Sequence, residues 1–145
     1  MYPNFDNGEY VLTDLISKRI STYDRGDVIV FHAPTENDKD FIKRIIGIHG
    51  DTVSVSNGEV YLNGKMLNEN YLPSNYITAG GSFLNEGAQI TVPEGNYFVM
   101  GDNRSNSSDS REWGFVSEDE VIGRSFFVYW PIGSFRAVDH AEIIP

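Results

Sequence analysis

Two Asn-Gly pairs, Asn57-Gly58 and Asn63-Gly64, place the strongest constraint on what this chain can fold into. A type I′ turn needs positive φ at both central residues, and Asn followed by Gly tolerates that conformation well. The residues beside the two pairs are rich in Val, Thr and Tyr, which favour strands. Residues 52–56 and 59–62 and the segment after the second pair are therefore predicted to form an antiparallel β-meander.

Short apolar and β-branched runs recur along the rest of the chain, separated by clusters of Gly, Pro, Asn and Asp. This spacing predicts a mainly β protein with few short helices. Residues 67–89 are polar but keep several large apolar side chains, which indicates an irregular lobe rather than a linker. Ser117, which three acids follow, is expected to cap a helical turn. Further strands are predicted at residues 9–14, 28–32, 40–50, 90–92, 96–100 and 124–130, before a weakly structured tail from residue 133.

Composition excludes several classes of function. The 145 residues carry 11 Lys and Arg against 21 Asp and Glu, a net charge of −10, which opposes binding to a nucleic acid backbone. The chain has no Cys, so disulfides, a thiolate nucleophile and a Cys-based zinc site are excluded. No histidine has the spacing of a metal motif, and His32 and His49 are expected to be structural. We expect no metal and no cofactor.

The length of 145 residues predicts one domain. No apolar run approaches the roughly 20 residues that a membrane-spanning helix needs. If the intact protein is bound to a membrane, its anchor is expected to lie outside these residues.

Lys43 stands out within the strand predicted at residues 40–50. Side chains alternate between the two faces of a strand, so Lys43 is expected on one face with Phe41 and Ile45. The other face is expected to carry Ile42, Arg44, Ile46 and Ile48. Both faces are apolar, so the strand is expected to be covered on both sides. Burial would remove water from the Lys43 amine and lower its pKa, which would make it a general base able to activate a serine hydroxyl. The alternatives are a lysine that reaches solvent at the strand end, or one paired with Asp40.

Residues 101–111 form a wholly polar loop directly after an apolar strand. A loop of this kind, held by a scaffold, commonly organises a site. Its acids do not have the spacing of an EF-hand calcium loop. An ion pair between Asp109 and Arg111 is predicted. Arg44 cannot act as a base, because its guanidinium stays protonated. Arg44 is instead expected to form a structural ion pair with an acid of this loop. The serines are either solvated or hydrogen-bonded to a buried amine.

Several segments together resemble type I signal peptidases, the Ser–Lys proteases that remove export signals. The resemblance extends from residue 1 to about residue 130, and the segments occur in the order that the family has. They are residues 1–3 (MYP), 25–31 (RGDVIVF), 43–47 (KRIIG) with 50–51 (GD), 101–104 (GDNR), 106–107 (NS), 109–111 (DSR) and 113–114 (WG).

This resemblance implies a fold and a set of roles. The fold would be a complex of antiparallel β-sheets in a single catalytic domain, residues 1–145, with a smaller inserted β or irregular subregion at about residues 53–95. Lys43 would be the general base, and Ser107 would hydrogen-bond the lysine amine. The resemblance assigns structural support of the site to Arg44, Asp102, Arg104, Asp109 and Arg111. It assigns substrate binding, as an added strand, to Met1, Tyr2, Asp40, Phe41 and Ile42.

By the same resemblance, the substrates would be signal peptides of exported preproteins with small residues at positions −1 and −3. The enzyme would work at the extracytoplasmic face of the cytoplasmic membrane, in contact with the membrane surface. The family's nucleophilic serine immediately precedes the methionine that aligns with Met1. That serine, the serine of the oxyanion hole and the membrane anchor all fall outside this chain. The chain as written is therefore expected to be inactive or nearly so.

Three other interpretations remain open at this point. A repressor-type Ser–Lys autoprotease shares the dyad, but it lacks the long insertion after the lysine strand and the pattern at residues 101–111. A non-catalytic peptide-binding module would keep the sheet without a nucleophile. A structural β-domain would show no proximity between Lys43 and Ser107.

Overall fold

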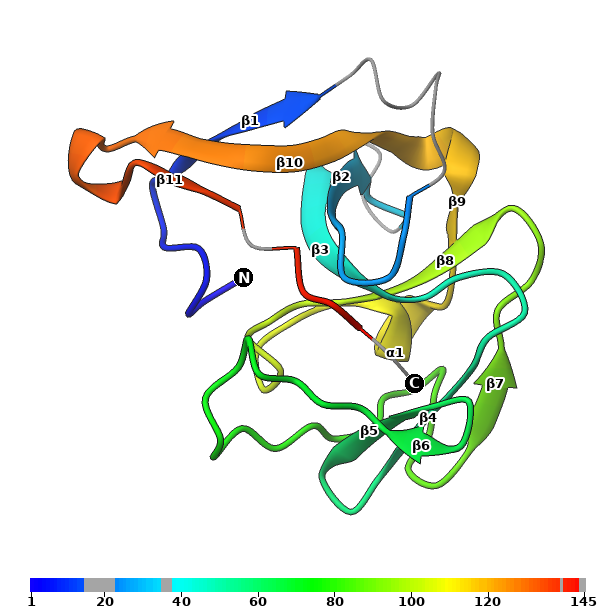
Figure 1. Ribbon diagram of the computed structural model, residues 1–145. Helices are drawn as coiled ribbons and strands as arrows, with labels where there is room; N and C mark the ends of the chain where they lie inside the picture. Colours follow the sequence, from blue (N-terminus) through cyan, green and yellow to red (C-terminus); the bar gives the residue numbers. More distant parts are fainter. Residues whose placement is uncertain (15–22, 35–37, 139, 144–145) are drawn as a thin grey trace.

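The computed structural model describes residues 1–14, 23–34, 38–138 and 140–143, which form antiparallel β-sheets (Figure 1). The larger sheet contains β1 (Tyr10–Asp14), β2 (Val28–His32), β3 (Asp40–Gly47), β8 (Asn96–Met100), β9 (Val116–Ser117), β10 (Val121–Trp130) and β11 (Arg136–Ala137). Its order is β1-β10-β2-β3-β8-β9, with β11 also paired to β10. Every pairing is antiparallel, so the predicted mainly β, antiparallel fold is confirmed.

The smaller sheet confirms the predicted meander. It contains β4 (Thr52–Ser56), β5 (Glu59–Leu62), β6 (Lys65–Met66) and β7 (Gln89–Thr91), in the order β6-β5-β4-β7. Both Asn-Gly pairs adopt positive φ, 54° and 86° at Asn57 and Gly58 and 53° and 79° at Asn63 and Gly64. The turns therefore have the backbone sign that the sequence predicts. Residues 67–88 connect β6 to β7 without a regular element, as an irregular lobe.

Helical structure in the described residues is limited to single turns. These are α1 (Ser110–Trp113) and the 3-10 turns η2 (Glu118–Glu120) and η3 (Ile132–Ser134). Ser117 caps η2 as predicted, and the Glu120 side chain reaches back to the Ser117 backbone in a capping box. None of the described helices is long and apolar enough to pass through a lipid bilayer.

Strand β3 is covered on both faces, as the sequence predicts. Ile45 packs in a core cluster with Phe41 at its edge, whereas Ile42 and Ile46 contribute to two other clusters. Ile48 was expected to share the face of Ile46, and this is wrong, because it packs with the Ile45 cluster. The pairing of β3 with β8 slips between Ile45 and Gly47, and such an irregularity reverses the alternation beyond it. The strand accordingly ends at Gly47 rather than at residue 50.

The C-terminal tail is more ordered than the sequence suggests. Beyond η3 it adds β11 to the larger sheet, and the side chains of Val138 and Ile143 are buried in two different core clusters. Figure 1 shows this tail crossing from the larger sheet toward the smaller one. It passes so close to Gly26 that a Cβ there would lie 1.7 Å from the Ala141 carbonyl oxygen. This packing depends on contacts between residues far apart in the sequence, which local patterns do not predict.

Gly26 therefore has two roles: it adopts the positive φ of a turn, and its missing side chain lets the tail pack against it. We expect Gly26→Ala to lower the free energy of unfolding by about 3 kcal/mol, from positive-φ strain plus overpacking. Gly50→Ala is the matched control, because Gly50 has a similar φ of 84° against 88° but open space around its Cβ. Urea unfolding of both variants measures the difference, and equal losses would show that the tail does not pack on Gly26.

Candidate active site

Lys43 projects from β3 into a mostly buried environment. Burial lowers the pKa of its amine below the usual 10.5, because the charged form loses water. The carboxylates of Asp109 and Asp102 oppose this shift, and Arg111 reinforces it. The alternative in which Asp40 pairs with Lys43 is wrong, since Asp40 Oδ1 lies 2.9 Å from His32 Nδ1 across the strands. The amine is therefore biased toward its neutral form.

Ser107 lies beside Lys43, with Gly101 next to both. A Cβ on Gly101 would lie 2.1 Å from Ser107 Oγ and 3.6 Å from Lys43 Cδ, so only glycine leaves room there. Ser107 Oγ is buried and makes no hydrogen bond of normal geometry, although it lies near enough to Asp109 to help lower the pKa of that carboxyl. The hydrogen bond predicted between Ser107 and the lysine amine is thus not formed. Lys43 Nζ instead lies 5.1 Å from the centre of the Phe41 ring, a cation–π distance.

The start of the chain meets Lys43 at the same place. Burial lowers the pKa of the Met1 amino group, the positive charge of Lys43 lowers it further, and Asp102 opposes the shift. The two amines therefore lie within electrostatic reach of each other. Met1 Sδ accepts a hydrogen bond from the Asp102 backbone at 3.5 Å, and the Met1 side chain packs with Ile42 in one cluster.

The loop at residues 101–111 is closed by the carboxylate of Asp109. Asp109 accepts hydrogen bonds from the backbone N–H of Gly101 at 3.0 Å and of Arg111 at 3.2 Å, and from the Arg111 guanidinium at 2.8 and 2.9 Å. Burial opposes the ionisation of Asp109, but the Arg111 hydrogen bond and charge lower its pKa overall. The predicted ion pair is confirmed, and it also caps α1.

A second ion pair joins the loop to β3, as predicted for Arg44. Arg44 and Asp102 are both almost completely buried, with Nε to Oδ1 at 3.0 Å and Nη2 to Oδ2 at 2.9 Å. Asn4 adds a hydrogen bond of 2.8 Å to the Asp102 carboxylate, which ties the chain start to the same group. Because Lys43 and Arg44 are neighbours on one strand, this pair fixes the segment that carries the lysine.

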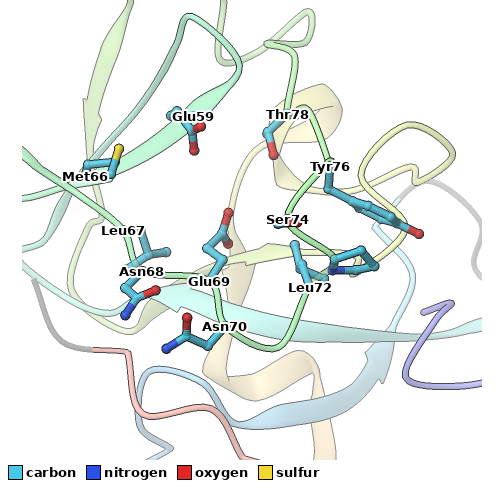
Figure 2. A pocket seen from close by; sticks show the side chains of 11 residues that line it. Glu59, Met66, Leu67, Asn68, Glu69, Asn70, Leu72, Ser74, Tyr76 and Thr78 are labelled. Carbon is cyan, nitrogen blue, oxygen red and sulfur yellow. The ribbon is translucent and has the colours of Figure 1, made fainter.

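Arg104 belongs to the loop, but its partner does not. Its guanidinium binds the Glu69 carboxylate at 2.5 and 2.8 Å, Thr78 Oγ1 at 3.0 Å and the Tyr71 hydroxyl at 3.0 Å. All three partners belong to the irregular lobe. Glu69 and Thr78 also line a pocket of about 360 Å³ in that lobe, seen in Figure 2. The lobe is therefore bonded directly to the polar loop.

Sequence reasoning missed Glu69, Tyr71 and Asn4. One signal was available, because the two acids of the loop are used by Arg111 and Arg44 and leave Arg104 in need of a third acid. With 21 acids in the chain, nothing local singles out Glu69. Tyr71 also lies under Arg44, with the guanidinium carbon 4.4 Å from the ring centre, and burial raises the pKa of its hydroxyl.

Three of the residues predicted to bind substrate, Asp40, Phe41 and Ile42, lie on a strand segment with one unpaired edge. Asp40–Lys43 pair with β2, whereas β8 pairs with β3 only from Arg44 onward. Among the described strands, none pairs with the second edge of this segment. Phe41 and Ile42 are half-buried on opposite faces of that segment, and Tyr2 is exposed near the chain start. A peptide backbone could hydrogen-bond to such an edge.

The described residues contain no cluster of three or more His, Cys, Asp or Glu side chains able to hold a metal ion. His32 is bonded to Asp40 at the exposed end of β3, and His140 Nδ1 lies 3.1 Å from Asp27.

Comparison with known proteins gives consistent matches. A family model described as "Signal peptidase, peptidase S26" matches residues 1–130. The probable signal peptidase I-2 of Synechocystis sp. is 44% identical over 138 residues, which are 91% of this chain and 60% of that protein. Signal peptidase IB of Staphylococcus aureus is 36% identical over 147 residues, which are 94% of this chain and 76% of that protein. This chain therefore spans only part of either relative.

A solved structure matches as well. The crystal structure of a signal peptidase I from Enterococcus faecalis superposes with a TM-score of 0.60 at 35% sequence identity. The match covers 72% of this chain and 97% of that one.

The buried pair Arg44–Asp102 gives a stability prediction. Asp102→Asn should lower the free energy of unfolding by about 3–5 kcal/mol, because it leaves the Arg44 charge buried without a counter-ion. Asp40→Asn is the matched control, since its His32 pair is exposed and should change stability by at most about 0.5 kcal/mol. Urea unfolding at neutral pH measures both, and similar small losses would contradict a structural role for the buried pair.

Proposed function

The chain belongs to the signal peptidase S26 family of serine peptidases, and from this premise we propose that it is the catalytic part of a Ser–Lys endopeptidase. Its reaction is the removal of N-terminal signal peptides from exported preproteins. We propose further that residues 1–145 form one catalytic domain with an inserted subregion at about residues 53–95, bonded to the polar loop through Arg104.

One observation carries this proposal: the mostly buried Lys43 side chain lies beside Ser107, and its amine is within electrostatic reach of the Met1 amino group. A neutral amine is a competent proton acceptor, and burial favours the neutral form. The nucleophile of the proposal is a serine joined directly to the Met1 nitrogen, because that nitrogen lies within electrostatic reach of Lys43. Ser107 acts as a positioning residue that turns toward the amine when the site is occupied.

The reaction follows from these positions. Lys43 takes the proton of the serine hydroxyl while the serine oxygen bonds to the scissile carbonyl carbon. The C–N bond then breaks, and the departing amine receives the proton back from the lysine ammonium. Water attacks the resulting ester and gives a proton to Lys43. The ester C–O bond breaks, the lysine ammonium returns the proton to the serine oxygen, and the signal peptide leaves with a free carboxyl group. Asp102, Arg104, Asp109, Arg111 and Arg44 hold the loop and strand that position the lysine.

Substrate selection is assigned to the free edge of β3. The signal peptide adds a strand beside Asp40, Phe41 and Ile42, with the Met1 and Tyr2 segment facing it. Main-chain hydrogen bonds supply affinity that does not depend on sequence. The side chains at positions −1 and −3 are two residues apart and therefore point to the same side of the added strand, where the proposal requires both to be small.

The proposal places the enzyme at the extracytoplasmic face of the cytoplasmic membrane. An apolar surface at the joined ends of β1 and β10 supports contact with lipid, since Tyr10 and Tyr129 form an edge-on pair there and Trp130, Ile132 and Phe135 are exposed beside them. In Figure 1 the joined ends of β1 and β10 lie at the end of the larger sheet farthest from the smaller sheet. Exposed aromatic and aliphatic clusters of this kind mark interaction sites.

A non-catalytic peptide-binding module is the competing interpretation. The residue encoded immediately before Met1 separates the two: a serine supports the peptidase, and any other residue supports binding without cleavage.

The general base is tested in the protein with a serine directly before Met1. We expect Lys43→Ala to reduce cleavage of an Ala-x-Ala precursor peptide by at least about a thousandfold while the domain still folds. Lys43→Arg should be equally inactive, because a guanidinium stays protonated. Lys65→Ala, which removes an exposed lysine of β6, is the control and should keep full activity. Activity of either Lys43 variant would remove the lysine from the mechanism.

The lowered pKa of Lys43 also predicts the pH profile. The amine must be neutral to accept a proton, so kcat/KM should rise with pH as the lysine deprotonates. Because the folded-state pKa is lowered, the half-maximal point should fall below the usual 10.5 of a free lysine. Initial rates measured from about pH 6 to pH 11 test this. A profile whose midpoint lies at or above 10.5 would show a solvated amine.

A further inference from the structure

A pocket at the start of the chain has no role in the reaction as described. Its volume is about 370 Å³, and it is lined by Met1, Tyr2, Phe5, Asp6, Asn7, Asn103 and Asn106. Two of its lining residues connect it to the candidate active site. The Met1 nitrogen is within electrostatic reach of Lys43, and Asn106 directly precedes Ser107, which lies beside Lys43. No residue of β3 lines it, so the pocket and the β3 edge assigned to the signal peptide share only the Met1 and Tyr2 segment.

The parts of the substrate on the two sides of the scissile bond need separate binding sites. The acyl half stays bonded to the serine after the first step, and the amine half departs with the first residues of the mature chain. If the acyl half occupies the β3 edge, the amine half needs space beside the Met1 nitrogen that β3 does not supply. Among the described residues, the pocket at the chain start provides such space next to the reacting groups.

The pocket has an electrostatic preference as well as a volume. Its lining contains one carboxylate, that of Asp6, and no Lys or Arg side chain. Arg136 lies within electrostatic reach of Asp6, but its guanidinium is bound to the Glu9 carboxylate by two hydrogen bonds of 2.7 Å. The positive charge of Arg136 is thus balanced by the negative charge of Glu9, and the negative charge of Asp6 is left without a balancing cation in the pocket lining. A cation in the pocket gains from that charge, and an anion is repelled.

Asp6 is held on a fixed segment rather than on a free terminus. The Phe5 N–H donates to the Met1 carbonyl at 3.0 Å, and the Phe5 ring packs in a core cluster. Asn4 donates to the Asp102 carboxylate, and the Asp6 N–H donates to Glu9 at 3.0 Å. The backbone that carries the exposed Asp6 side chain is therefore fixed before substrate arrives, which limits the positions open to the carboxylate.

We propose that this pocket receives the first residues after the scissile bond, and that Asp6 makes it favour basic over acidic side chains there. This inference rests on the proposed peptidase function and names a feature of its substrates. The new amino group that cleavage creates is itself a cation, so the same carboxylate also favours the departing product.

The test uses the protein with a serine directly before Met1, whose Met1 nitrogen is then an uncharged amide. Three peptides share one Ala-x-Ala sequence and differ only in the two residues after the cut, which are Lys, Gln or Glu. We expect kcat/KM to fall from Lys to Gln to Glu, about tenfold in all at low salt, with a smaller range at high salt.

Two variants distinguish a preference for basic peptides that comes from the pocket from one that comes from the net charge of −10. Asp6→Asn should abolish the preference while keeping the backbone hydrogen bonds of Asp6. Glu94→Gln removes an equal charge from the turn between β7 and β8, outside the pocket, and should keep the preference. Equal rates for the three peptides, or an Asp6→Asn variant that keeps the order, would overturn the inference and leave the peptidase function intact.

If none of the peptides is cleaved, the proposed function fails, and a binding measurement then judges the pocket alone. A product peptide with a free amino terminus and two lysines is titrated into the protein by NMR. Shifts of the Asn103 and Asn106 side-chain amide signals that Asp6→Asn removes would support the pocket. Unchanged signals would overturn it.

Discussion

The buried carboxylate of Asp109 is the interaction on which the rest of the site depends. It binds the backbone at Gly101, where the polar loop leaves β8, and both the backbone and the guanidinium of Arg111, where the loop enters α1. One side chain therefore closes the loop at both ends. Gly101 in turn leaves room for Ser107 beside Lys43. Without the closed loop, neither the hydroxyl nor the carboxylates would have fixed positions around the amine, and the balance that sets its pKa would be lost.

Three buried ion pairs, Arg44–Asp102, Arg104–Glu69 and Arg111–Asp109, hold the site together. Because of them, separate parts of the chain contribute to one site. Arg44 ties β3 to the loop, and Arg104 ties the loop to Glu69 of the irregular lobe. Arg111 also donates to the Ala79 carbonyl, and its own carbonyl accepts from Phe83 and Leu84. Buried charges are costly unless they are paired and hydrogen-bonded, so these parts must come together with their partners correctly placed. The lobe is accordingly an integral support of the loop.

Local patterns predicted much of the fold. The Asn-Gly turns, the cap at Ser117 and strands β2, β4, β5 and β8 agree with the sequence because turn chemistry and side-chain alternation act over a few residues. The ion pairs of Asp109 and Arg44 were also predictable, since charges in an apolar setting need partners. The side of Ile48 and the order of the tail were not predictable, because they follow from a slip in strand pairing and from contacts across the chain.

The sequence by itself determined the antiparallel scaffold and the chemical types gathered at the site: an amine on a strand covered on both sides, and a loop rich in serine and paired charges. Only the tertiary structure decided which groups meet. It paired Arg104 with Glu69, left Ser107 without a hydrogen bond to Lys43, and brought Met1 within electrostatic reach of Lys43. The physical reason is that alternation and turn geometry are local properties, whereas the desolvation and charge that an amine experiences are set by neighbours distant in the sequence.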